Sequence, residues 1–242
     1  MQSRYSAFLF LLLFFFVSCE DDGLETVNSY ETELKPFHTI ELNSVFDVYL
    51  IQDTLFAIKI VAAENVIKHV QFTVDENILR VSNEMPSKWL SPGGNKVKLY
   101  ITSNLLYEIL PNATCSITTL NPIISDEFRI VMGHSPKLTE INLTLACKSF
   151  LYWNNHQCGG RVTLSGQSDN IFLYAYGLMS IDAGQLNAQY AFVENNSKGN
   201  CEVFVNDMLE YSIRGVGNIY LRGNPEIILN EQTSSGRLIN VD

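Results

Sequence analysis

Apolar and polar residues alternate along most of the chain after residue 36, with the two-residue period of strands that bury one face. Phe46, Val48 and Leu50 form one such run, and similar runs continue to the C-terminal segment. Residues 62–70 and 103–110 depart from the pattern, and there we expect no more than a turn or two of helix. The alternation therefore predicts an all-β fold.

A second, longer period runs through the second half of the chain. Small and polar residues gather in turn-like clusters that lie roughly 19 to 22 residues apart. Self-similarity of this length is typical of a solenoid, in which each coil stacks on the preceding one. We predict a solenoid of about 20–22 residues per coil from residue 109 onward, with more irregular β-structure before it. The clusters are Asn112-Ala113-Thr114, Gly133-His134-Ser135, Asn154-Asn155-His156, Tyr176-Gly177, Asn195-Asn196-Ser197, Gly215-Val216-Gly217 and Ser235-Gly236.

Two sets of apolar residues keep the same long period, which indicates two or more strands per coil and an interior built by stacking. The first set comprises Ile117, Leu138, Ile181, Val203, Ile219 and Leu238. The second set comprises Ile123, Leu143 or Leu145, Leu164, Leu186, Met208 or Leu209, and Ile227. Because cysteine fills such interiors well, we favour buried free thiols over disulfides for Cys115, Cys147, Cys158 and Cys201.

The N-terminus has the features of an export signal. An apolar run from Ala7 to Val17 is too short to span a bilayer and ends at Ser18-Cys19, which resembles a bacterial lipobox. We predict a signal peptide over 1–18, lipidation of Cys19 and an acidic flexible tether over 19–35. A plain secretory signal is the alternative. The lipid would be the membrane contact, because no later segment is apolar over 18 residues.

Acidic residues directly behind Cys19 resemble the surface-export signal of lipoproteins from Bacteroidetes-group bacteria. The expected location is therefore the outer membrane, at the cell surface, with its periplasmic face as the alternative. The rest of the chain, residues 36–242, is expected to form one domain. It could contain two sub-lobes, over 36–108 and 109–242.

The C-terminal segment carries a family resemblance. Met208 to Pro225 contains an alternating strand, Gly215-Val216-Gly217-Asn218, a second short strand and Gly223-Asn224-Pro225. Together with the paired strands of 37–53, this resembles the head GIN domain family of auto-transporter adhesins. The resemblance covers residues 36–240 and implies a right-handed, parallel β-helix-like solenoid in an exported lipoprotein. It supplies no catalytic motif.

Charge and motif content narrow the function classes. The formal net charge is −10 and the 16 Lys and Arg residues are scattered, which argues against nucleic-acid binding. No HExxH, CxxC or GxSxG motif occurs. His134 and His156 could stack about 5 Å apart on neighbouring coils, and with Cys158 they would be the best metal candidate; we favour two turn histidines instead. We expect no enzyme activity, cofactor or metal.

Aromatic residues are the remaining candidates for binding. They gather in two neighbouring coils, and we take Tyr152, Trp153, Tyr174 and Tyr176 as a possible outward stripe. Two-residue alternation places Tyr152 and Tyr174 on one face and Trp153 on the other. Stacking in the interior is the alternative.

The function predicted from the sequence is that of a non-catalytic, surface-anchored adhesin or binding module with a glycan or protein ligand. Two alternatives stay open. One is a carbohydrate-active enzyme on a β-helix, which would need paired carboxylates projecting from neighbouring coils. The other is a structural envelope spacer without a specific ligand.

Overall fold

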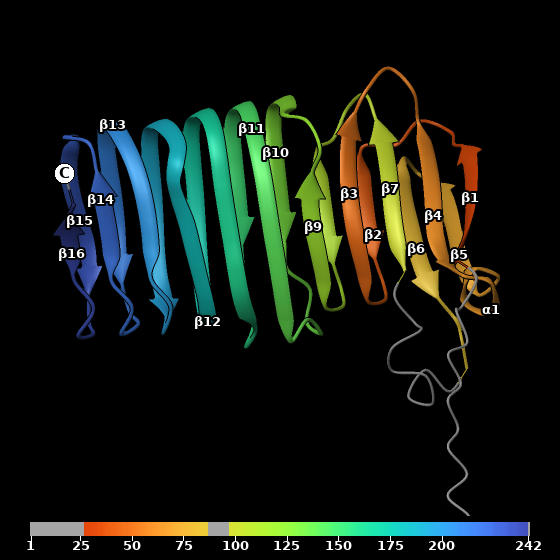
Figure 1. Cartoon of the computed structure of the whole chain (residues 1–242). Coiled ribbons are helices and arrows are strands. Elements are labelled where there is room, and N and C mark those ends of the chain that lie inside the picture. Colours follow the sequence, from red (N-terminus) through yellow and green to blue (C-terminus); the bar gives the residue numbers. More distant parts are fainter. Residues whose placement is uncertain (1–26, 87–96, 242) are drawn as a thin grey trace, which may run out of the picture.

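The computed structural model describes residues 27–86 and 97–241 (Figure 1). The predicted signal peptide, Cys19 and the first part of the expected tether lie outside these ranges. The described residues form one 16-stranded sheet and a single short helix, and no helix among them is long and apolar enough to cross a membrane. The elements are β1 (Val27–Glu33), β2 (Thr39–Leu42), β3 (Phe46–Gln52), β4 (Ala57–Ala63), α1 (Glu64–Ile67), β5 (Val70–Asp75), β6 (Ile78–Asn83), β7 (Lys98–Ser103), β8 (Glu108–Pro111), β9 (Cys115–Thr119), β10 (Ile123–Val131), β11 (Leu138–Trp153), β12 (Gly159–Ser197), β13 (Cys201–Ile213), β14 (Ile219–Arg222), β15 (Glu226–Gln232) and β16 (Leu238–Asn240).

The second half is a parallel β-solenoid, as predicted. Leu138 of β11 pairs with Gly159 of β12, 21 positions later, and Ile181 of β12 pairs with Cys201 of β13, 20 positions later. The next coil is shorter, because Cys201 pairs with Ile219, 18 positions on. In Figure 1 these strands stack side by side in sequence order toward the C-terminus.

Stacked apolar side chains fill the interior of the solenoid. Ile117, Ile181, Val203 and Ile219 from the first predicted set are buried, at 0% to 2% exposure. The predicted burial of Leu138 is wrong, because its side chain points outward and is 63% exposed. Ile141 takes its place, because the residue that pairs with Ile117 is Ile141. The turn before β11 is longer than the others, so counting from the turn cluster selects the wrong residue.

The first half continues the same sheet with less regular pairing. Parallel pairs join β2 to β8 and β3 to β9, while β1, β4, β5 and β6 take part in antiparallel pairs. Gln52 ties the halves together: its backbone N–H donates to Asn121 Oδ1 at 2.9 Å, and its Nε2 donates to the Ile124 carbonyl at 2.8 Å. The irregular character predicted for this region is confirmed.

Two local expectations in this half are wrong. Residues 27–33, assigned to a flexible tether, form β1, which pairs with β4 through the whole strand. Residues 103–110 form no helical turn; they lead into β8, where Ile109 is buried and pairs with Ile40 of β2. Backbone pairing outweighs the polar composition of the first segment. The short helix expected within 62–70 is present as α1.

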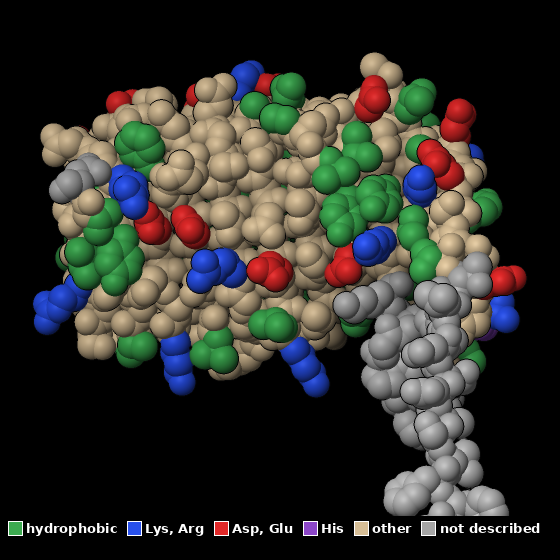
Figure 2. Space-filling view, viewed as in Figure 1, with side chains coloured by type: hydrophobic (Ala, Val, Ile, Leu, Met, Phe, Trp, Pro, Cys, Tyr) green, Lys and Arg blue, Asp and Glu red, His purple; other side chains and the backbone are tan. Residues whose placement is uncertain are grey.

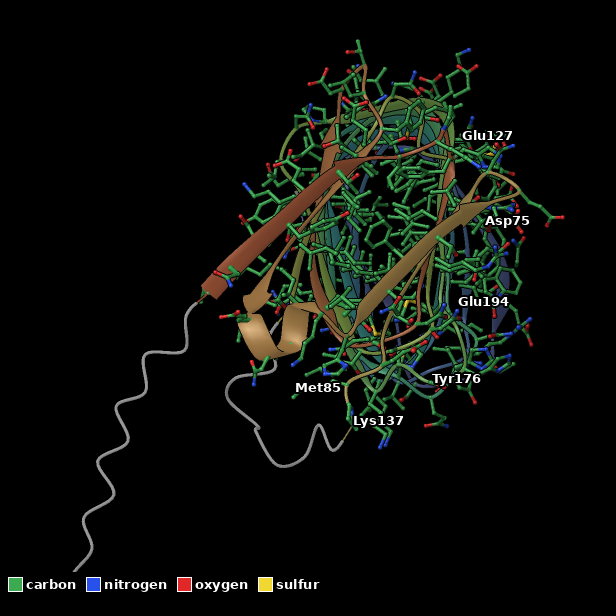
Figure 3. The ribbon with its side chains drawn as sticks, turned by 90° about the vertical axis from the view of Figure 1, so that its right-hand side faces the viewer. Asp75, Met85, Glu127, Lys137, Tyr176 and Glu194 are labelled. Carbon is green, nitrogen blue, oxygen red and sulfur yellow. The ribbon has the colours of Figure 1, made fainter. Side chains whose placement is uncertain are left out.

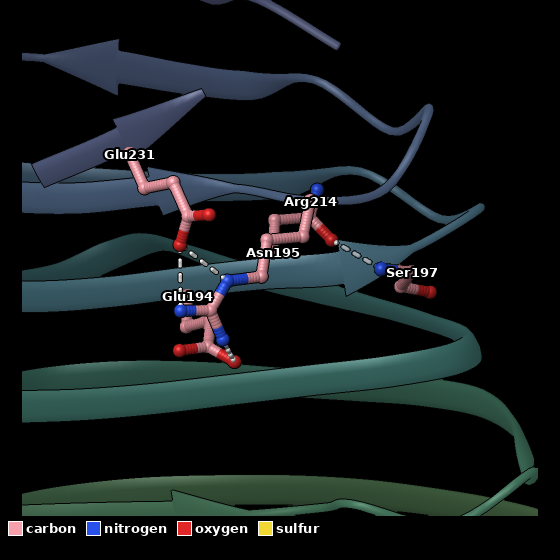
Figure 4. Close-up of polar contacts among 5 residues, drawn as sticks. All are labelled: Glu194, Asn195, Ser197, Arg214 and Glu231. Carbon is pink, nitrogen blue, oxygen red and sulfur yellow. Dashed lines mark hydrogen bonds and ion pairs between the residues drawn. The ribbon is translucent and has the colours of Figure 1, made fainter. Parts of the chain in front are cut away.

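Asparagine side chains fix several of the turns. Asn195 is fully buried, and its Oδ1 accepts from the Ser197 N–H at 3.0 Å (Figure 4). Its Nδ2 donates to the Asn218 carbonyl of the next coil at 3.3 Å. Asn154 acts in the same way toward the carbonyl of Tyr176, at 3.0 Å. A buried amide that bonds across coils sets the spacing of the turns as well as their shape.

The four cysteines that the structure describes are buried free thiols, as expected. Burial raises the pKa of Cys115 and of Cys201 to about 12. These groups therefore stay protonated and serve as apolar filling in the interior.

Candidate binding face

Six outward side chains form a continuous apolar strip on the side of the solenoid that carries β10, the second half of β11 and two segments of β12, a strand that runs through two coils. We call this strip the aromatic ribbon. It arises because parallel in-register pairing repeats the outward position on each coil: Leu151 pairs with Phe172, and Trp153 pairs with Tyr174. Trp153 is 37% exposed and the others are half-buried. The ribbon comprises Leu151, Trp153, Phe172, Tyr174, Tyr190 and Phe192.

The rings of the ribbon touch from coil to coil. Ring centroids are 4.5 Å apart between Trp153 and Tyr174 and 5.4 Å apart between Tyr174 and Phe192. In the parallel row, the centroids of Phe172 and Tyr190 are 5.8 Å apart. The tilted arrangements have the geometry that aromatic pairs prefer, so the rings hold one another in place without a ligand.

A shallow pocket of about 310 Å³ opens at the N-terminal end of the ribbon. Its apolar floor is bordered by Glu127, Arg129 and Ser149. Arg129 is fixed there, because its Nε lies 2.7 Å from Glu108 Oε1 and its guanidinium carbon lies 4.5 Å from the ring centroid of Tyr107. The pocket thus offers ring faces beside a carboxylate, a guanidinium and a hydroxyl.

Acidic residues border both long sides of the ribbon. Figure 3, which looks along the solenoid from its N-terminal end, shows Glu127 near one edge of this side and Glu194 and Tyr176 toward the other edge. Lysine and arginine on the opposite side of the body are interspersed with carboxylates, and uncharged surface separates them (Figure 2).

The two tyrosines of the ribbon are neutral phenols at physiological pH. Burial and the neighbouring carboxylate of Glu210 raise the pKa of Tyr190 to about 12, and its hydroxyl donates to Glu210 Oε1 at 3.0 Å. Burial, with a smaller contribution from Glu194, also raises the pKa of Tyr174. The rings therefore add no charge to the ribbon.

The predicted arrangement of the aromatic stripe is partly right, but the faces assigned to Tyr152 and Trp153 are wrong. Trp153 and Tyr174 share the outward face, whereas Tyr152 is fully buried and pairs with the interior residue Leu173. The interval from one strand to the next is 21 residues here, so residues 22 apart, such as Tyr152 and Tyr174, face opposite ways. Tyr176 is half-buried on the outward side, next to the ribbon but outside its ring contacts.

Sequence reasoning missed Tyr190 and Phe192. They lie one coil further on, and their rings contact those of Phe172 and Tyr174, 18 positions earlier in the chain. The signal was present as alternation, since two aromatic residues lie two positions apart in both coils. A fixed interval of about 21 residues does not reach them.

A second groove, of about 480 Å³, bears on the enzyme alternative. Asp126 and Asp169 line it from different coils, and Lys148 lies 2.7 Å from Asp126 Oδ1. The side chains of Lys148 and Asp126 are 70% and 80% exposed. A general acid needs burial to raise its pKa, so this exposure is typical of a solvated ion pair.

The rings of His134 and His156 meet on neighbouring coils, with centroids 4.0 Å apart and the ring planes tilted by 49°. His134 is exposed and His156 is half-buried; desolvation, and then the proximity of His134, lower the pKa of His156. In the part of the chain that the structure describes, no group of three His, Cys, Asp or Glu residues could hold a metal ion.

Solved structures of other proteins share this fold. A protein from Bacteroides fragilis described as "a putative adhesin" has a TM-score of 0.80 at 23% identity, over 90% of this chain and 98% of that chain. A "putative adhesin" from Parabacteroides distasonis has a TM-score of 0.68 at 16% identity, over 90% and 98%. A "Putative lipid binding protein" from the same species has a TM-score of 0.62 at 19% identity, over 91% and 98%. A search of curated proteins gave no match.

The family comparison agrees with the residues that first indicated it. The family model described as "Putative auto-transporter adhesin, head GIN domain" matches residues 36–225, which is most of the chain. The matched span begins just before β2 and ends just before β15, so it includes the irregular first half together with the solenoid. The chain belongs to the head GIN domain family.

Proposed function

We propose that this protein is an exported, surface-anchored adhesin that binds a glycan through the aromatic ribbon. The observation that carries the proposal is the row of contacting outward rings, Trp153, Tyr174 and Phe192. A contiguous row of apolar side chains on an outer face is typical of binding sites. Sugar rings present flat faces of C–H groups that pack on aromatic rings, and the adhesin-like family supports an exported or surface role.

The polar border favours a glycan over a lipid. One neighbour of the same fold is described as a lipid-binding protein, and an acyl chain would fit an apolar strip. Glu127, Arg129 and Ser149, however, line the pocket beside the rings. Sugar hydroxyls can bond to these groups, whereas an acyl chain would leave them without compensation.

Removing a ring tests the ribbon directly. Trp153→Ala should weaken glycan binding at least tenfold, because losing the apolar surface that the ligand would cover on this ring costs on the order of 1.5–3 kcal/mol. Tyr49→Ala is the matched control: Tyr49 stacks on Tyr100 at 4.8 Å on strands β3 and β7, away from the ribbon. Binding to a glycan array is the measurement. Equal binding by the two variants, with both shown to be folded by thermal melting, would contradict the proposal.

The tether is proposed to be lipid-anchored at Cys19, with the body at the outer surface of the outer membrane. The apolar run before Cys19 and the acidic residues after it support this. Cys19→Ala should move the protein from the membrane fraction to the soluble fraction. Unchanged membrane association would reject the anchor, and protection from added protease in intact cells would indicate the periplasmic face instead.

Two alternatives remain distinguishable by experiment. A carbohydrate-active enzyme would release shorter products from a bound polysaccharide, and Asp126→Asn or Asp169→Asn would abolish this release. A structural spacer would bind no glycan, lipid or protein through the ribbon. Glycan binding without product release, and dependent on Trp153, is the outcome that the adhesin proposal expects.

A further inference from the structure

We propose that the ligand of the aromatic ribbon is an uncharged linear glycan that lies along the solenoid axis, one sugar unit for each coil. This rests on the proposed glycan-binding function and specifies the class of ligand. Three features of the described residues support this inference. They are the shape of the apolar surface, the charges around it, and the ion pairs that already hold the nearby arginine side chains.

The ribbon is long along the axis and narrow across it. Trp153, Tyr174 and Phe192 follow one another on successive coils at steps of 4.5 and 5.4 Å, each about the length of one sugar ring. Across a strand the ribbon is two residues wide: the polar residues Ser149 and Asn170 come before Leu151 and Phe172, and Tyr176 follows Tyr174 outside the ring contacts. A chain running along the axis therefore packs on every ring in turn, whereas a chain crossing it would meet one coil and then the polar border.

One carboxylate lies on each side of the ribbon, and two more lie toward its C-terminal end. Glu127 borders the pocket on one side, and Glu194 lies on the other. Toward the C-terminus, the residue that pairs with Phe192 is Glu210, and the residue that pairs with Met208 is Glu226. A uronate, sulfate or phosphate group on the ligand would meet like charge along this border.

The cations identified beside the ribbon are already held by carboxylates. Arg129 lies 2.7 Å from Glu108. Arg214 contacts Glu194 at 3.0 Å and Glu231 at 2.7 Å, as Figure 4 shows. An anionic polymer would have to break such pairs to gain a counter-charge. The neutral phenols of Tyr174 and Tyr190 add none.

Titration calorimetry of the full chain with oligosaccharide series tests both parts of the inference. The probes are cello-, laminari-, xylo- and manno-oligosaccharides of one to six units, together with C6-oxidised counterparts of the glucose series. For the neutral series that binds, we expect the affinity to rise more than tenfold from one unit to three or four and then to level off. The oxidised counterparts should bind at least tenfold more weakly. Equal affinity for monomer and tetramer, or equal or tighter binding of the oxidised chain, would overturn the inference.

Two variants separate length from charge. Phe192→Ala removes the third ring, so it should weaken the tetrasaccharide while leaving the disaccharide unchanged. The double variant Glu210→Gln with Glu226→Gln should improve binding of the oxidised chain and leave the neutral chain unchanged, since neither residue lines the pocket and Gln keeps an acceptor for Tyr190. Equal effects of Phe192→Ala on both lengths, or no gain for the oxidised chain, would contradict the proposed orientation or the proposed charge selection.

Failure of the inference and failure of the proposed function give different results. Binding that depends on Trp153 but selects monosaccharides or uronates rejects only the inference. Absence of binding to all these probes, or binding that Trp153→Ala leaves intact, rejects both. Capture of a long-chain fatty acid that depends on Trp153, without any glycan binding, would assign the ribbon to lipid instead.

Discussion

Adjacent residues in β11 have opposite roles. Tyr152 points into the interior and is fully buried, while Trp153 points outward at the start of the ribbon. The hydroxyl of Tyr152 has no hydrogen-bond partner among the described residues. A buried polar group in this state costs stability, so the interior uses this tyrosine for the volume of its ring.

Replacing Tyr152 therefore tests the corrected facing. Tyr152→Phe should leave the melting temperature unchanged or raise it, because an unpaired buried hydroxyl costs about 1–3 kcal/mol. Tyr152→Ala should cost about 3–5 kcal/mol through the cavity it leaves. Glycan binding should survive Tyr152→Phe. A lowered melting temperature in the Phe variant would show that the hydroxyl is bonded in the folded protein.

The contact between His134 and His156 predicts that the stability of the folded protein depends on pH. The pKa of His156 in the folded protein lies below its ordinary value of 6.5, so the unfolded chain binds the proton more readily. The stability from this group is complete above pH 6.5 and decreases as the pH falls below it. The melting temperature should therefore drop between pH 7.5 and 5.5.

Two variants check the cause. His156→Gln should reduce this drop, and His134→Gln should reduce it less, because desolvation contributes more than His134 to the lowered pKa. Thermal melts at the two pH values measure the effect. An identical drop in the wild type and in His156→Gln would assign the pH dependence to other groups.

At the scale of single elements, the turns decide how the strands align. The turn at Asn195 holds its own backbone and that of the next coil through one buried amide, with a further bond to the Gly199 carbonyl at 3.2 Å. Such bonds set how many residues each coil contains. They also determine which side chains meet along the axis.

Asn195→Ala should destabilise the protein by about 1–3 kcal/mol, because it leaves the buried Ser197 N–H and two part-buried carbonyls without their partner. Asn196→Ala is the control one position away, at a half-buried site, and it should change stability by less than about 0.5 kcal/mol. Chemical denaturation measures both. Equal midpoints for the two variants would argue against the role of the Asn195 amide.

The strands and the coil length could be predicted from the sequence, because alternation and turn clusters depend on neighbouring residues alone. The facing of the ribbon could not. Leu151 pairs with Phe172, 21 positions later, whereas the ring of Phe172 contacts that of Tyr190, 18 positions later. An error of one residue in that interval turns every side chain to the other face.

The edge strand β1 could not be predicted either, because its order also depends on a partner that is distant in the sequence. Its residues are mostly exposed and polar, so their composition resembles that of a linker. Their order comes from backbone pairing with β4, to which the side-chain pattern contributes little. Val27 to Glu33 pair with Ala63 to Ala57 in an unbroken antiparallel ladder.

At the scale of the whole molecule, one interior column joins every coil. Ile181, Cys201 and Ile219 occupy equivalent buried positions on consecutive coils. Each coil depends on its neighbours to cover its apolar face, which makes the stability of the solenoid a property of the stack.

A charge placed within the interior column should therefore destabilise the protein strongly. Ile219→Asp places an unpaired carboxylate at a fully buried site, at a cost of several kcal/mol, comparable with the total stability of a typical domain. Tyr220→Asp, at the adjacent outward position, should be tolerated. Circular dichroism and thermal melting give the readout. An unaltered melting temperature for Ile219→Asp would contradict the interior assignment.

The in-register ladder between β11 and β12 also means that the molecule can be lengthened in whole units. Leu138 pairs with Gly159, so the segment 138–158 forms one complete coil and brings the chain to the equivalent position on the next coil. A tandem copy of this segment, inserted after residue 158, would add one coil and keep the strand pairing of the coils on both sides of it. It would also duplicate Leu151 and Trp153 on the same side of the body. Evolution, or an engineer, could thus adjust the reach of such a protein by duplicating a single short stretch of its gene.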